Sequence, residues 1–128
     1  MPLPPKPANE AERLAALRAS RLLDSPPEQA YDDLVRLATA IYGTTTGAIT
    51  LVDENRQWFK ARQGFDGGQT PLEESFCAYT ILDPERVLMV EDTAADPVFA
   101  DNPALTGGLK VRFYAGVPLL DAEGMALG

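Results

Sequence analysis

The chain of 128 residues suffices for one domain with a single core, and its 45% apolar and 23% charged residues are ordinary for a globular protein. Its net charge of -8 disfavours nucleic acids and anionic membrane surfaces as partners, and no apolar run approaches the roughly 20 residues that cross a bilayer. The chain has no histidine, and its one cysteine excludes an intrachain disulfide and fits a reducing, cytoplasmic setting.

The N-terminal part of the chain predicts an extended segment followed by two helices. Residues 1–8, MPLPPKPA, predict a flexible proline-rich N-terminus, so the domain is expected to occupy 9–128. Residues 9–23 predict a weakly amphipathic helix that packs against the domain or against a second copy of the chain. SPPE at 25–28 has a capping serine, a proline suited to the first turn and a glutamate three residues after the serine, which indicates a helix start.

The second helix is the most clearly patterned element, and Gly43 ends it. Apolar residues recur at helical spacing through it, which predicts that one of its faces is buried. These residues are Tyr31, Leu34, Val35, Ala38, Ile41 and Tyr42.

The rest of the chain predicts mainly strands. Gly47–Val52 and Gln57–Gln63 predict a hairpin around a polar turn. Further elements are expected as a short helix near 75–82, a strand at Val87–Val90 and a strand at Val111–Leu120. A returning strand begins at Met125 but has only four residues, fewer than the five or six that pair well, so we expect the given sequence to be a fragment of a longer chain.

Negative charge is concentrated in one segment. Between Gly64 and Ala104 there are nine acidic residues and one basic residue, Arg86, whereas the charges in the rest of the chain sum to zero. A solvated acidic face is one interpretation. The functional alternative is a surface that repels anionic ligands or recruits a basic partner.

The absence of histidine removes most catalytic chemistry. Ser-His-Asp and Cys-His arrangements, a usual structural zinc site and histidine-ligated haem all need a residue that this chain lacks. No glycine loop has the spacing of a phosphate-binding motif. We therefore expect a protein without catalytic activity of its own.

The segment EESFCAYTIL, residues 73–82, holds the single cysteine, Cys77, between Phe76 and Tyr79. A nucleophile, a chromophore attachment point, a redox trigger and a packed apolar side chain are the possible roles. Aromatic and acidic neighbours favour a raised thiol pKa and inert packing, with redox sensing as the alternative.

Five blocks of the sequence, in order, resemble a bacterial GAF domain: LLDSPPEQAYDDLVRLATAIYG, ITLVDENRQWFKARQGF, PLEESFCAYTIL, VLMVEDTAADPVFADNP and VRFYAGVPLLDAEGMALG. The resemblance is closest to GAF domains found N-terminal in sensor histidine kinases, diguanylate cyclases and phosphodiesterases. It implies an α+β fold with an antiparallel sheet of about six strands, helices on one face and a ligand pocket on the other. The blocks around Cys77 and between Asp92 and Leu109 would cover that pocket, and a further strand and a C-terminal helix would follow MALG. Bilin attachment is disfavoured because no histidine accompanies Cys77.

The expected ligand-binding residues combine this resemblance with side-chain chemistry. They are Trp58, Lys60, Phe76, Cys77, Tyr79, Asp92, Asp96, Phe99, Arg112 and Tyr114. Core packing is the alternative for Trp58, and an ion pair with Asp92 or Asp96 is the alternative for Arg112.

Two functions are consistent with these patterns. The first is a sensory domain that binds a small molecule and signals through a homodimer to a C-terminal output domain, such as a histidine kinase of a two-component system. The second is a ligand-free dimerisation and relay module, in which aromatic side chains fill the pocket.

Overall fold

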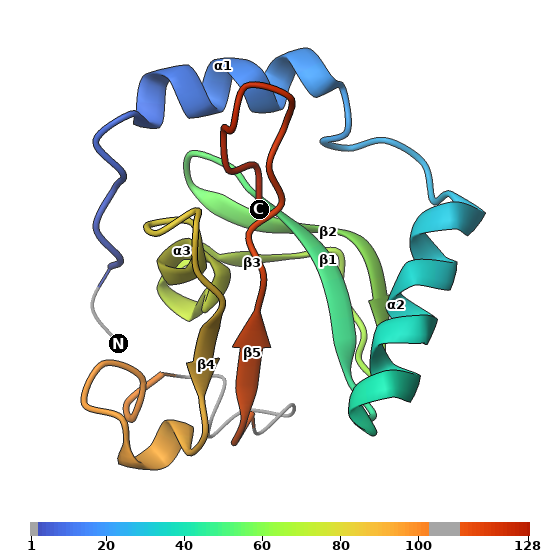
Figure 1. The fold of residues 1–128 in the computed structure, drawn as a ribbon, viewed down its shortest axis with the longest axis vertical. Helices are drawn as coiled ribbons and strands as arrows, with labels where there is room; N and C mark the ends of the chain where they lie inside the picture. Colours follow the sequence, from blue (N-terminus) through green and yellow to red (C-terminus); the bar gives the residue numbers. More distant parts are fainter. Residues whose placement is uncertain (1–2, 103–110) are drawn as a thin grey trace.

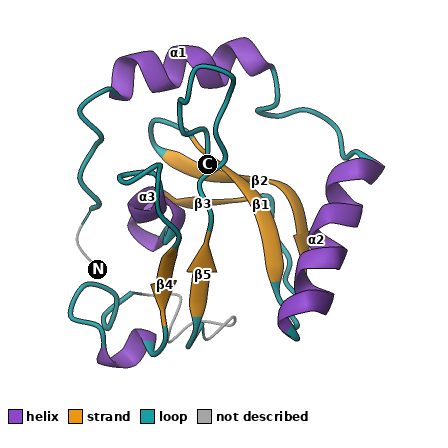
Figure 2. Cartoon of the chain, viewed as in Figure 1, coloured by secondary structure: helices purple, strands orange, loops and turns teal. Residues whose placement is uncertain are grey.

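The structure, a computed structural model, describes residues 3–102 and 111–128 as an α+β domain (Figure 1). Two helices come first, and short strands and turns follow (Figure 2). The elements are α1 (Glu10–Ser20), α2 (Gln29–Tyr42), β1 (Gly47–Val52), β2 (Arg56–Gln63), β3 (Gln69–Pro71), η1 (Leu72–Glu74), α3 (Cys77–Thr80), β4 (Leu88–Val90), η2 (Thr93–Ala95) and β5 (Tyr114–Gly116).

The strands form two antiparallel ladders among the described residues. One has the order β1-β2-β3, with an irregularity in register between Ile49 and Thr50, and the other pairs β4 with β5. The predicted hairpin is confirmed, and β3 adds a short third strand after it. The strand expected over 111–120 is paired as a strand only at Tyr114–Gly116.

The C-terminal residues lie beside the free edge of β1. The Val52 amide donates to the Leu127 carbonyl at 2.9 Å, and the Leu119 amide donates to the Gly128 carbonyl at 2.8 Å. The segment from Met125 to Gly128 therefore lies between β1 and the residues that follow β5, and it is hydrogen-bonded to both. The further strand and helix expected after this segment stay predictions.

Helices cover both faces of the β1–β2 ladder. Leu51 packs with Leu14 and Leu17 of α1, whereas its neighbour Val52 packs with Ala78 of α3. Because successive residues of a strand point to opposite faces, α1 and α3 lie on opposite sides of the sheet.

The helix α2 buries less of its surface than its sequence pattern predicts. Only Val35 and Thr39 are buried, and they lie over Gly47, where a Cβ would come within 2.7 Å of the Thr39 methyl carbon. The larger apolar side chains Leu34, Ile41 and Tyr42 of the predicted face are exposed instead, and so is Leu37, which lies outside that face. The prediction that this face is buried is therefore wrong except around Val35, because helical periodicity identifies an apolar face but does not show whether another element covers it.

The SPPE segment does not start α2 as predicted, because a buried cation binds it. Lys60 Nζ of β2 lies 2.6 Å from Ser25 Oγ, 2.7 Å from the Pro26 carbonyl and 2.6 Å from Glu28 Oε2. The serine and the glutamate of the expected capping box therefore contact Lys60, and the helix begins only at Gln29. These contacts join the connection between α1 and α2 to the sheet.

We predict that Lys60→Met destabilises the domain by about 2 kcal/mol, because the polar atoms around the buried ammonium lose their partner. Chemical denaturation of the purified protein measures this change. The control is Arg62→Met, which removes an exposed cation from the same strand and should change stability by less than about 0.5 kcal/mol. Equal losses in the two variants would contradict the structural role of Lys60.

Candidate functional site

Four aromatic side chains from three segments form one cluster on the α3 side of the sheet. The Phe76 ring lies 5.1 Å from Tyr114, nearly parallel to it, and 4.9 Å from Phe99. Tyr79 meets Phe99 edge to face at 5.0 Å. Phe76 and Phe99 are buried together with Val90 of β4. The sequence predicted all four aromatic residues at the site, and the structure brings them together.

A polar trio lies within this apolar cluster. Tyr114 Oη is 2.7 Å from Thr80 Oγ1 and 3.3 Å from Cys77 Sγ, so the hydroxyl of β5 binds two side chains of α3. The Tyr114 ring folds over Gly116, where an added Cβ would lie only 2.1 Å from the Tyr114 hydroxyl. Glycine at that position therefore leaves room for the tyrosine.

Burial keeps both titratable members of the trio uncharged. Loss of hydration raises the pKa of the Tyr114 hydroxyl well above its ordinary value. Burial also raises the pKa of the Cys77 thiol, which hydrogen bonds from Thr50 and Tyr114 only partly offset. A neutral thiol is a poor nucleophile, so the structure confirms the predicted direction of the Cys77 pKa and favours the packing role.

The sequence analysis missed Thr80 and Gly116. Thr80 lies three residues after Cys77 on a short helix, so its position on the same face could have been recognised from spacing. The close approach of Gly116 to Tyr114 depends on tertiary packing, and no local pattern signals it.

The segment that carries Phe99 is hydrogen-bonded to the residues just before β5. The Thr93 amide donates to the Arg112 carbonyl at 2.8 Å, and Thr93 Oγ1 donates to the Val111 carbonyl at 2.7 Å. Arg112 pairs with Asp92 at 3.3 Å, which confirms the predicted ion pair. Because an exposed ion pair contributes little to the free energy of unfolding, the hydrogen bonds of Thr93 hold the two segments together more strongly than the Arg112–Asp92 pair does.

The two acidic residues proposed for the site make local backbone contacts. Asp92 accepts a hydrogen bond from the Ala94 amide at 3.1 Å, and Asp96 accepts one from the Val98 amide at 2.8 Å. Both carboxylates therefore shape the turns that place Phe99 in the cluster. Neither carboxylate is drawn into the aromatic cluster by these contacts.

Trp58 and Lys60 lie apart from the aromatic cluster. Trp58 packs against the α1 cluster that contains Leu17 and Leu51. Lys60 binds the connection between the first two helices, as described above. Both residues contact elements on the α1 side of the sheet, whereas the aromatic cluster lies on the α3 side.

Two hollows in the described part of the surface lie away from the aromatic cluster. One is a gap of about 10 Å³ beside α3, and the other is an open groove of about 540 Å³ between α1 and the 121–127 turn. Residues 103–110, which we expected to help cover the pocket, lie outside the described residues. Over residues 3–102 and 111–128, no metal-ligating cluster of three or more His, Cys, Asp or Glu occurs, and no helix could span a membrane.

A curated relative matches the whole chain. The chain is 41% identical over 128 residues to "Cyclic di-GMP phosphodiesterase PA2567" of Pseudomonas aeruginosa. The match covers all of this chain but only 22% of the relative.

Solved structures and a family model agree on the fold. The chain resembles the GAF domain of a phosphoenolpyruvate-protein phosphotransferase from Coxiella burnetii, with a TM-score of 0.59, 16% identity and coverage of 93% of this chain and 73% of that chain. A GAF sensor protein from Burkholderia vietnamiensis gives a TM-score of 0.54, 21% identity and coverage of 92% and 75%. The family model of the GAF domain matches residues 26–128, so the chain belongs to the GAF domain family.

Proposed function

We propose that this GAF domain is a cytoplasmic, non-catalytic sensor that binds a small molecule at the aromatic cluster and regulates an output domain of the same protein. The polar trio of Cys77, Thr80 and Tyr114 carries the proposal. A few convergent polar groups inside an apolar, aromatic environment are typical of small-molecule sites. An uncharged ligand fits best, because the segment that includes Asp92 and Asp96 is strongly acidic.

A ligand-free relay module is the second candidate. The Phe76 ring lies 4.9 Å from the Phe99 ring and 5.1 Å from the Tyr114 ring, so the aromatic side chains already fill much of the space between α3 and β5. Ligand binding would therefore require Phe99 to move away from Phe76. The short turns that hold Phe99 make such a movement feasible.

We further propose that the output is hydrolysis of cyclic di-GMP. The support is the 41% identity to a cyclic di-GMP phosphodiesterase across the whole of this chain. This relative favours a phosphodiesterase output over the histidine kinase of a two-component system that we had considered.

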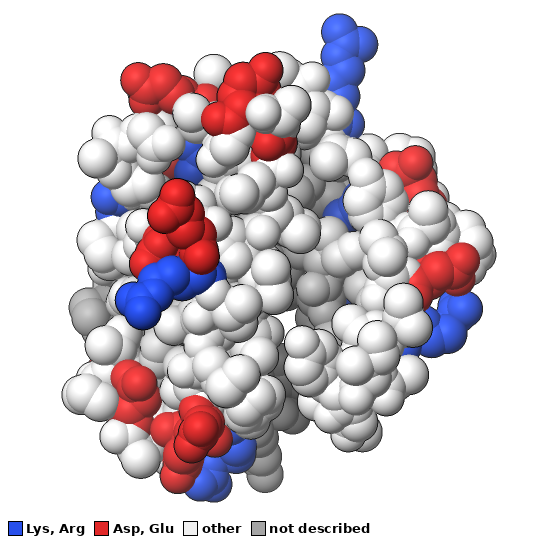
Figure 3. Space-filling model, in the orientation of Figure 1, with Lys and Arg blue, Asp and Glu red and all other residues white. Residues whose placement is uncertain are grey.

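A homodimer would carry the signal, and α2 offers a better surface for it than α1. The apolar side of α1 is occupied, because Leu14 and Leu17 are buried against the protein's own sheet. On α2, four large apolar side chains are exposed, from Leu34 to Tyr42. In Figure 3, which has the orientation of Figure 1, the surface on the right, where α2 lies, is mostly uncoloured, with charged side chains at its outer edge and further ones on the left of the face.

We predict that Tyr114→Phe abolishes small-molecule binding by the full-length protein. The variant keeps the aromatic ring but loses the hydroxyl that joins the polar trio. Native mass spectrometry of the purified protein detects the bound molecule as added mass. The control is Tyr42→Phe, which changes an exposed tyrosine of α2 and should leave the bound mass in place. A wild-type protein without any bound mass would support the ligand-free relay, and a bound mass retained in Tyr114→Phe would place the ligand elsewhere.

We predict that the double variant Leu37→Glu and Ile41→Glu shifts the full-length protein from dimer to monomer in sedimentation experiments. Two carboxylates in an apolar interface cannot be desolvated without partners. The matched control, Arg36→Gln on the same helix, should leave the dimer intact. A dimer that survives both glutamates would exclude α2 from the interface.

A further inference from the structure

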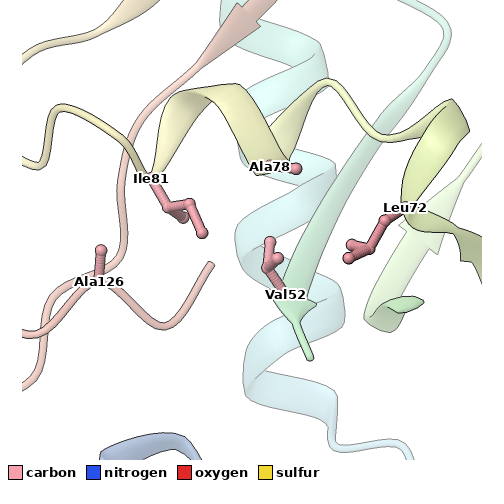
Figure 4. Packing of buried hydrophobic residues seen from close by; sticks show 5 residues of the cluster. All are labelled: Val52, Leu72, Ala78, Ile81 and Ala126. Atoms are coloured by element: carbon pink, nitrogen blue, oxygen red, sulfur yellow. The ribbon is translucent and has the colours of Figure 1, made fainter. Parts of the chain in front are cut away.

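The N-terminal arm, residues 3–8, packs against α3 instead of extending into solvent. Pro4 is buried, and the arm faces a small apolar surface formed by Val52, Leu72, Ala78 and Ile81. Figure 4 shows Val52, Leu72 and Ile81 pointing toward one another at this surface. About 10 Å³ of free space is left between arm and domain, hardly enough for one water molecule.

The arm is also attached by a cation and leads directly into α1. Lys6 Nζ donates to the Glu54 carbonyl at 2.5 Å and lies 3.8 Å from Glu10 Oε2. The Glu10 amide donates to the Pro7 carbonyl at 3.1 Å. These contacts attach the arm to the first turn of α1.

The helix α3 lies between this arm and the aromatic cluster. Ala78 and Ile81 belong to the cluster beneath the arm, whereas Phe76 and Tyr79 belong to the aromatic cluster. A helix of four residues has little stability of its own, so packing on both sides sets its position.

We propose that the N-terminal arm is a releasable clamp that couples α3 to α1, so that displacement of α3 frees the arm and release of the arm loosens α3. One buried proline and one exposed lysine make a small attachment, which opens more readily than the core does. The coupling is reciprocal, because both events share the same contacts. As a route for signalling, the clamp depends on the proposed sensory function.

Hydrogen exchange of the full-length protein tests the clamp without any ligand, so its outcome is independent of the Tyr114 binding test. Pro4→Gly combined with Lys6→Ala should raise amide exchange in residues 76–82 about tenfold, while α2 keeps its wild-type rate. The control variant, Ala8→Gly, loosens the arm backbone without removing a contact of the apolar surface and should leave both rates unchanged.

The reverse direction is tested with Ile81→Val, a small change that keeps the core packed. Amide exchange in the first turn of α1 should then rise severalfold, with α2 unchanged. Wild-type exchange of residues 76–82 in the arm variant would overturn the proposal. An equal rise in α2 would also overturn it, because the arm would then stabilise the whole domain and not α3 in particular.

Discussion

Three segments that are far apart in the sequence meet at Val52, and the arrangement of the domain depends on this meeting. Its amide donates to the Leu127 carbonyl, and its own carbonyl accepts from Arg13 Nη1 at 2.7 Å. The same guanidinium donates to the Ala126 carbonyl at 3.3 Å and pairs with Glu10. Because Arg13 is almost fully buried, this network fixes α1 on the sheet and closes the C-terminal segment against β1.

The two sides of the sheet that meet at this junction are held together by different contacts. On the α1 side, Lys60 and Arg13 hold the helices to the sheet through buried, charge-assisted hydrogen bonds. On the α3 side, the elements are short and are held by ring contacts and by the Tyr114 hydroxyl. A sensory site is expected where local stability is low, and α3 with its neighbours fits that requirement.

The sequence predicted the fold class and the family well, because helical spacing, strand alternation and five blocks of residues agreed. Phe76, Phe99 and Tyr114 could also be assigned to one site. The sequence did not predict that Lys60 binds the connection between α1 and α2. Strand alternation shows which residues share a face of the sheet, but it does not show which helix or loop covers that face. The partners of Ser25 and the exposure of α2 depend on contacts between distant segments, which no local pattern records.

In the function that we propose, the aromatic cluster controls a phosphodiesterase outside this GAF domain in the same protein. The most direct test compares cyclic di-GMP hydrolysis by the full-length protein with that of its Tyr114→Phe variant. We expect the variant to fold normally and to lose regulation, so that its rate no longer changes when cell extract containing the natural metabolites is added. A variant that responds to the extract as the wild-type protein does would contradict the claim.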